Sequence, residues 1–195
     1  TKSNSIAKEL GLVVKQKEPN AFTLAKLKRE AENVKKINLA QGYELLGMIA
    51  CIKSDLETCK TQHKASITID NDPTAHLNYA RSLIILGDYE SAYKVLKNAT
   101  NQHPYDSDIL ELTASTALNS GHHSETQKYI HLYEKLNPSI SNDELIASSL
   151  ISEQITKAGI NDQYASSIMK ISNQLIIKNK LKVINKTVFF DESKT

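Results

Sequence analysis

Two helix-breaking residues of this chain return together at a fixed interval. Gly87 and Pro104 are followed by Gly121 and Pro138, and each interval is 34 residues. Apolar and small residues lie between them at steps of three and four, which is typical of α-helices. A recurrence of this length indicates an array of similar units, in which each unit buries its apolar face against the next one. The chain is therefore expected to fold as a row of helical units.

Residues 73–106 form the most regular unit. Asp72 stands before Pro73, which is the pattern of an N-capping side chain followed by proline at the first helical position. Gly87 predicts the end of this helix, and Asp88 predicts the cap of a second one. The residues expected on the buried faces are Leu77, Ala80, Leu83 and Ile84 in the first helix and Tyr89, Ala92, Tyr93, Leu96 and Ala99 in the second.

Two further units follow when this pattern is shifted along the chain. A shift of 34 residues gives a unit at 107–140, and a shift back by 33 gives one at about 40–72 that lacks the turn glycine. In the latter, Ser54 and Glu57 stand three apart and predict a capping box for its second helix. The positions that correspond across the units are Ala80 with Ala114 and Gly47, Ala92 with Thr126 and Cys59, Leu96 with Ile130, and Asp88 with Asp55.

These units resemble tetratricopeptide repeats, which are helical hairpins of 34 residues with small residues in both helices and a closing proline. The matching residues are Ala80, Gly87, Tyr89, Ala92, Leu96, Ala99 and Pro104 in the unit 73–106 and Ala114, Gly121, Ile130 and Pro138 in the unit 107–140. Thr126 and Tyr133 depart from the family's preference for alanine. The resemblance covers about 100 of the 195 residues. It implies a right-handed α-solenoid whose concave face is lined by the first helix of each unit.

Helical segments flank the repeats on both sides. Residues 1–38 are expected to form an N-terminal helical cap that contains an amphipathic helix at 20–38. Residues 141–180 are expected to form a hairpin-shaped helical pair, which caps the stack or is a divergent repeat. Ser141 and Glu144 predict a capping box for its first helix. The fold class expected is therefore all-α, a right-handed α-solenoid of tetratricopeptide-like hairpins with helical caps at both ends.

The tail at 181–195 differs in character from the rest of the chain. Val183, Ile184, Val188, Phe189 and Phe190 have the propensity of a β-strand, yet no other strand is expected to pair with them. Three alternatives remain open, namely docking on the helical stack, contact with another chain, or disorder. Docking is favoured, because two adjacent phenylalanines are costly to leave in water.

Charge and hydropathy argue against two classes of partner. The net charge is +2, and the basic runs at 26–30 and 178–182 are short, so we expect no nucleic-acid binding. No apolar run has the length of a membrane span. No signal peptide is visible, and a periplasmic or envelope-associated location is slightly favoured over the cytoplasm.

Cys51 and Cys59 lie on either side of a predicted turn, where either a disulfide or two small buried thiols would fit.

A search for reactive groups predicts no catalytic residue, no metal site and no cofactor. His122, His123 and His131 are the only cluster of histidines, and the first two fall in the turn after Gly121 without a zinc-binding spacing. The sequence contains no phosphate-binding glycine motif and no nucleophile elbow. A non-enzymatic role is therefore expected.

The resemblance implies that polar residues of the first helices face a partner polypeptide. The residues expected in this groove are Gln41, Glu44, Met48, Leu77, Asn78, Arg81, Asp108, Glu111 and Ser115. Asn78 matches the asparagine of repeats that clamp a terminal carboxylate, but the lysines of that clamp are absent. Arg81 is placed to hold a carboxylate or a backbone carbonyl of the partner.

The function expected from these features is that of a scaffold that binds a protein or peptide in the groove. An assembly or secretion factor of a bacterial envelope is the form of this function that we favour. A regulator that responds to a signalling peptide is an alternative, and a subunit of an enzyme is a less favoured one. The oligomeric state and the identity of the partner are left open.

Overall fold

The computed structural model describes residues 1–16, 19–179, 181 and 183, and this part of the chain contains ten α-helices and no β-strand. The prediction of an all-α fold is confirmed. None of these helices is long and apolar enough to cross a membrane. The helices are α1 (Lys2–Val13), α2 (Ala21–Lys35), α3 (Leu39–Ile52), α4 (Leu56–Ile69), α5 (Pro73–Ile85), α6 (Tyr89–Gln102), α7 (Ser107–Asn119), α8 (His123–Leu136), α9 (Asp143–Lys157) and α10 (Asp162–Lys178).

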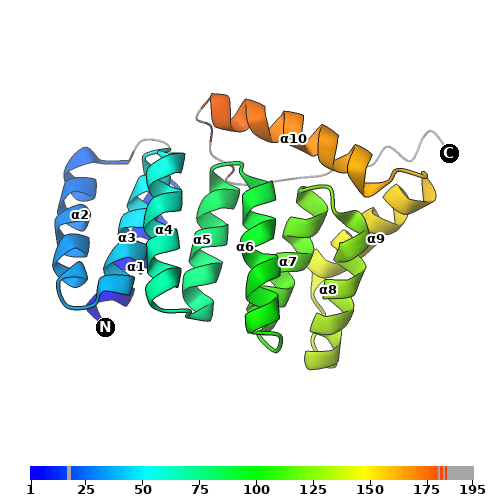
Figure 1. Cartoon of the computed structure of the whole chain (residues 1–195), viewed down its shortest axis with the longest axis horizontal. Helices are drawn as coiled ribbons and strands as arrows, with labels where there is room; N and C mark the ends of the chain where they lie inside the picture. The colour runs from blue at the N-terminus through cyan, green and yellow to red at the C-terminus, as the bar shows by residue number, and fades with distance from the viewer. Residues whose placement is uncertain (17–18, 180, 182, 184–195) are drawn as a thin grey trace.

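The first nine helices pack in the order of the sequence and form a single row (Figure 1). The pairs α3–α4, α5–α6 and α7–α8 correspond to the units 40–72, 73–106 and 107–140. Only α3 departs from its unit, because it begins one residue earlier. The second helix of each pair packs on the first helix of the next pair. The odd-numbered helices α1, α3, α5, α7 and α9 also contact one another in succession. The row therefore has one side formed by α1, α3, α5, α7 and α9.

The turns inside the pairs depend on one left-handed residue each. Gly87 and Gly121 have φ angles of 79° and 85°, a conformation that glycine adopts without steric cost. In the pair α3–α4 the same position is taken by Ser54, with a φ of 57°. In all three turns the next residue donates its N–H to a carbonyl five positions earlier, as in Asp88 to Leu83 at 2.9 Å.

The helix caps correct two of the sequence-based expectations. Asp55 caps α4 by accepting a hydrogen bond from the Thr58 N–H at 3.1 Å, so the predicted capping box at Ser54 is wrong. Ser54 is instead held in the left-handed conformation of the turn. The predicted box at Ser141 is also wrong, because the side chain that caps α9 is Asn142, which accepts from the Glu144 and Leu145 N–H groups. Asp72 and Asp88 cap α5 and α6 as expected.

Small residues let the helices of the row approach closely. Ala80, Ala92 and Ala99 are fully buried in the core of the central pair, together with Leu83 and Leu96. At Gly47 of α3 a methyl group would lie 2.6 Å from the ring of His63 on α4.

Cys51 and Cys59 are both buried and are not joined by a disulfide. Of the two alternatives for the cysteines, the structure has the buried thiols.

The last two helices do not form a pair like the others. Helix α9 packs on α7 and α8, as the first helix of another unit would. Helix α10 instead crosses the edge of the row, over the turns at Gly87 and Gly121 (Figure 1). A side chain at Gly87 would overlap Ile176, and one at Gly121 would overlap the backbone of Ser166. The outward side of α10 is apolar and exposed, with Tyr164, Ile168, Ile171 and Leu175 at helical spacing.

The predicted tail at 181–195 falls almost entirely outside the described residues. Residues 184–195, which include the two adjacent phenylalanines, belong to that part. At Val183 the backbone N–H donates to the carbonyl of Ile85 at 2.8 Å. The chain is therefore bound to the end of α5 at this residue.

Candidate functional site

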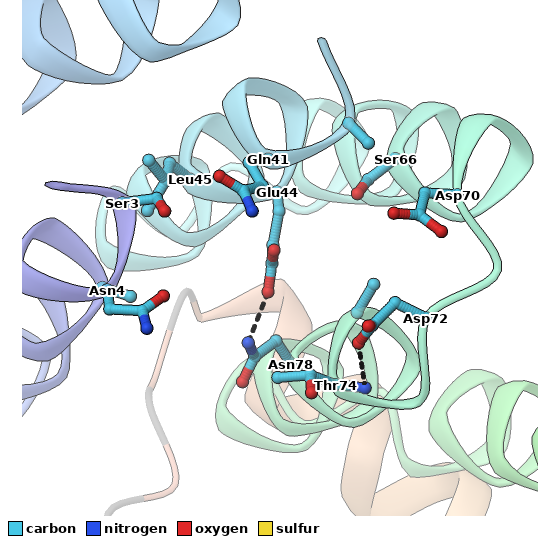
Figure 2. A pocket seen from close by; sticks show the side chains of 13 residues that line it. Ser3, Asn4, Gln41, Glu44, Leu45, Ser66, Asp70, Asp72, Thr74 and Asn78 are labelled. Atoms are coloured by element: carbon cyan, nitrogen blue, oxygen red, sulfur yellow. Dashed lines mark hydrogen bonds between the residues drawn. The ribbon is translucent and has the colours of Figure 1, made fainter. Parts of the chain in front are cut away.

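Three adjoining hollows follow the side of the row formed by the odd-numbered helices. The first, a cavity of about 430 Å³, lies between α1, α3, the end of α4 and α5 (Figure 2). We call it the carboxylate pocket because Glu44, Asp70 and Asp72 line it. Its other lining residues are Ser3, Asn4, Ala7, Ala40, Gln41, Leu45, Ser66, Thr74, Ala75 and Asn78.

Glu44 lies at the centre of the carboxylate pocket and joins α3 to α5. Its Oε1 accepts a hydrogen bond from Asn78 Nδ2 at 2.5 Å (Figure 2). Burial raises the pKa of Glu44, the hydrogen bond from Asn78 opposes this rise, and the charge of Asp72 adds to it. Asp72 is held in turn by the Thr74 N–H, at 2.7 Å. The structure therefore holds a partly buried negative charge beside a second one.

The other two hollows continue the first along the row. The second has about 270 Å³ between α1, α3 and α5, and its lining includes Met48, Asn78 and Arg81. The third has about 140 Å³ between α5, α7 and α9, and its lining includes Arg81 and Glu111. Asn78 borders both the first and second hollows, and Arg81 borders both the second and third. The three hollows are thus linked through two residues of α5.

Eight of the nine residues expected in the groove line these hollows. Gln41, Glu44 and Asn78 belong to the first, Met48, Asn78 and Arg81 to the second, and Arg81, Asp108, Glu111 and Ser115 to the third. Leu77 does not line them, because it is 5% exposed and packs in the core of the central pair. Helix α5 contacts α3, α4, α6 and α7, so only a narrow strip of its surface remains free for the groove.

The sequence analysis missed the contribution of α1 and of the chain between α4 and α5. Ser3 and Asn4 of α1 face α3 and α5 across the carboxylate pocket (Figure 2), and Ala7 of α1 also lines it. Ser66, Asp70 and Asp72 close its other side, but Asp72 was recognised only as a cap. The spacing of Ile6, Leu10 and Val13 was the available signal for α1, since it predicts a helix that buries one face on its neighbours.

A fourth hollow of about 630 Å³ lies between α10 and the turns that it crosses. His122 Nε2 lies 3.0 Å from Glu90, and its ring stacks on Tyr93 with centroids 4.5 Å apart. His123 Nε2 lies 3.0 Å from Asp162 at the start of α10, and Asp162 also accepts from Ser124. These side chains fix the beginning of α10 to the start of α8.

Across the described residues, no three His, Cys, Asp or Glu side chains are placed to hold a metal ion.

Comparison with known proteins adds no relative to this description. The chain matches no protein-family model, no curated protein and no solved structure. The geometry of the row and its hollows is therefore the basis for the function proposed below.

Proposed function

We propose that this protein is a non-enzymatic scaffold that binds an extended peptide or a helix of a partner protein along the linked hollows. In this proposal the row is a right-handed solenoid of tetratricopeptide-like hairpins, with helical caps at both ends. The observation that carries it is the continuity of the three hollows through Asn78 and Arg81. A continuous depression that crosses several helices suits a polypeptide better than a compact small molecule.

The chemistry of the groove also supports a polypeptide partner. Arg81 is exposed between two hollows, and it forms no ion pair or hydrogen bond with another described residue. Its guanidinium can donate several hydrogen bonds to a carboxylate or to backbone carbonyls. Asp108 and Glu111 lie near it on α7 and can accept from backbone N–H groups or basic side chains. Because these side chains stand on helices, the backbone that carries them is already ordered before the partner binds.

The proposal can be tested by affinity capture with quantitative mass spectrometry. We expect Arg81→Glu and Asn78→Ala each to lower recovery of the main partner at least ten-fold, since a few anchors dominate most interfaces. Lys64→Glu is the matched control, because Lys64 is exposed on α4, away from the lining of the hollows. Circular dichroism establishes that each variant is folded. Equal recovery by all three variants would contradict a binding site in the hollows.

A further inference from the structure

One side of α10 is apolar and exposed to solvent along most of the helix. We call this side the α10 strip. Its four side chains are 50–63% exposed and belong to Tyr164, Ile168, Ile171 and Leu175. The opposite side of α10 rests on the turns of the pairs α5–α6 and α7–α8 (Figure 1). Scattered apolar residues are common on protein surfaces, but a continuous row of large ones is typical of a surface that another molecule covers.

The spacing of the α10 strip is that of a coiled-coil seam. Its residues are separated by four, three and four positions, so they alternate as the a and d positions of a heptad. At helical geometry, Ser167 and Gln174 border the strip on one side and Ser172 borders it on the other, and all three are exposed. A seam of this kind receives one further helix, which packs along it at a small angle.

The α10 strip is complementary to a second copy of itself. When two α10 helices are aligned antiparallel, Tyr164 of each copy falls opposite Leu175 of the other. Ile168 of each copy then falls opposite Ile171 of the other, because both pairs are centred on the same point of the helix. A twofold axis through that point matches every apolar side chain of one strip with an apolar side chain of the other. This is the condition that a symmetric dimer interface must meet.

The charges of α10 agree with such a pair and select its orientation. Asp162 is turned toward α8, where it contacts His123, and Lys170 lines the fourth hollow, so neither borders the strip. Lys178 continues the seam at its end. In a parallel pair Lys178 would face the same lysine of the second copy, and like charges repel. In an antiparallel pair it faces Asn161 instead, and the two helix dipoles also oppose each other favourably.

The borders of the strip fit a second copy better than other occupants. A helix that lies on a membrane surface carries lysine and arginine beside its apolar face, whereas Ser167, Ser172 and Gln174 are uncharged. The same side chains give no charge pattern that would select a different protein. Figure 1 shows α10 at the edge of the row, where a second α10 has room to approach. No residue of α10 lines the three linked hollows, so pairing would leave them open.

We propose that the α10 strip is the interface of a homodimer in which two α10 helices pack antiparallel about a twofold axis. This inference goes beyond the proposed function and does not depend on it. Helix α10 has 17 residues and is about 25 Å long. One pair of helices of this length buries less area than a standard protein interface, so the dimer should be reversible, with a dissociation constant on the order of 10 μM.

Sedimentation equilibrium of the full chain between about 1 and 200 μM tests the dimer. The mass of the wild type should rise from 21.7 kDa toward twice that value. Ile171→Glu places a carboxylate in the seam and should weaken the dimer at least about fifty-fold. Gln163→Glu is the matched control, because it adds the same charge to α10 outside the strip and should dimerise like the wild type.

Circular dichroism separates association from folding. Ile171 is 63% exposed in the single chain, so Ile171→Glu should melt at the same temperature as the wild type at about 1 μM, where both are monomeric. A wild type that stays monomeric at every concentration would overturn the proposal and leave the strip to another occupant. A dimer that Ile171→Glu does not weaken would overturn it as well.

Cysteine pairing tests the antiparallel orientation. We expect an equal mixture of Tyr164→Cys and Leu175→Cys to form disulfide-linked dimers of one copy of each under mild oxidation. Either variant alone should not, because in the antiparallel pair its two cysteines lie about 16 Å apart along the helices, too far for a disulfide. Cys51 and Cys59 are buried and should not react. Efficient linking of either variant to itself, without linking in the mixture, would contradict the antiparallel dimer.

Discussion

His63 is enclosed at the point where α3, α4 and α5 meet. Its ring stacks on Tyr79 with centroids 5.1 Å apart, and its Nε2 lies 3.1 Å from the Ser82 hydroxyl. Burial lowers the pKa of His63 to about 3, so the ring stays neutral in the folded protein across the physiological range. The same ring fills the space that Gly47 leaves open on α3. This one side chain therefore couples the helices of two neighbouring pairs.

The depressed pKa of His63 makes the stability of the fold depend on pH. In the unfolded chain the imidazole binds a proton below about pH 6.5, whereas in the folded protein it does so only near pH 3. The unfolded state binds more protons in between, so the free energy of unfolding falls as the pH drops from about 6.5 toward 3. His63→Gln, which does not titrate, should lose less stability over this range.

Urea denaturation at pH 7 and pH 4 measures this difference. His63→Gln should be the less stable protein at pH 7, and its deficit relative to the wild type should shrink by about 2 kcal/mol or more at pH 4. A deficit that is the same at both pH values would show that His63 is not buried as described.

The resemblance to tetratricopeptide repeats was sufficient to predict most of the expected residues that line the three hollows, but not the boundaries of the hollows. Asn78 and Arg81 were identified because the resemblance places polar residues of the first helices on the concave side. Leu77, one position before Asn78, was placed in the groove on register alone, and it is buried. Asp70 could not be recognised, since a single acid at the end of a helix is typical of many surfaces.

At the scale of elements, the turn within each pair sets the geometry of the hairpin. Gly87 and Gly121 were predicted as turn residues, and both have positive φ angles. The turn at Ser54 has the same geometry without glycine, which costs an L-residue about 1–2 kcal/mol. The interval between the glycines could be found in the sequence, while the equivalent role of Ser54 could not.

Ser54→Gly should therefore stabilise the protein. We expect a gain of about 0.5–1 kcal/mol, after allowing for the greater freedom of glycine in the unfolded chain. This corresponds to an increase of about 2 °C in the melting temperature, measurable by calorimetry. Ser54→Ala is the control, since it retains the strain and should give no increase. A lower melting temperature for Ser54→Gly would contradict the left-handed conformation at this turn.

The position of α10 could not be predicted from its own residues. Its periodicity indicates a helix, but Ala165 is the only buried residue in it, so the pattern carries little information on what it packs against. Its place is decided by the turn glycines, which leave room for Ile176 and for the backbone of Ser166. The expectation of a hairpin at 141–180 was drawn from helical spacing alone and did not include this contact.

Replacing Gly87 separates the two functions of this glycine. Gly87→Val should destabilise the protein by about 1 kcal/mol or more, because it strains the turn and overlaps Ile176. Adding Ile176→Ala should relieve the overlap and recover only part of the loss, since the strain remains. Thermal unfolding of Gly87→Val, Ile176→Ala and the double variant measures the coupling between the two sites. Strict additivity of the two effects would show that α10 does not rest on this turn.

At the scale of the whole molecule, the packing is one-dimensional. Each of the first nine helices contacts its neighbours along the row, and the odd-numbered helices line one side of it (Figure 1). The repeat at 34 residues was sufficient to predict this order for the three central pairs. The depth and charge of the hollows depend on the packing of several helices, including α1, and on where no side chain fills the space on that side of the row. They could therefore not be predicted from the repeat alone.

Site-specific photo-crosslinking tests the central claim most directly. Benzoylphenylalanine is placed at Gln41 or Glu111, which line the first and third hollows, or at Lys64 or Lys94 on the second helices of the pairs. We predict that both groove positions form an adduct with the same polypeptide and that the two lysine positions do not. Adducts formed equally from all four positions, or only from the lysine positions, would contradict binding along the side formed by α1, α3, α5, α7 and α9.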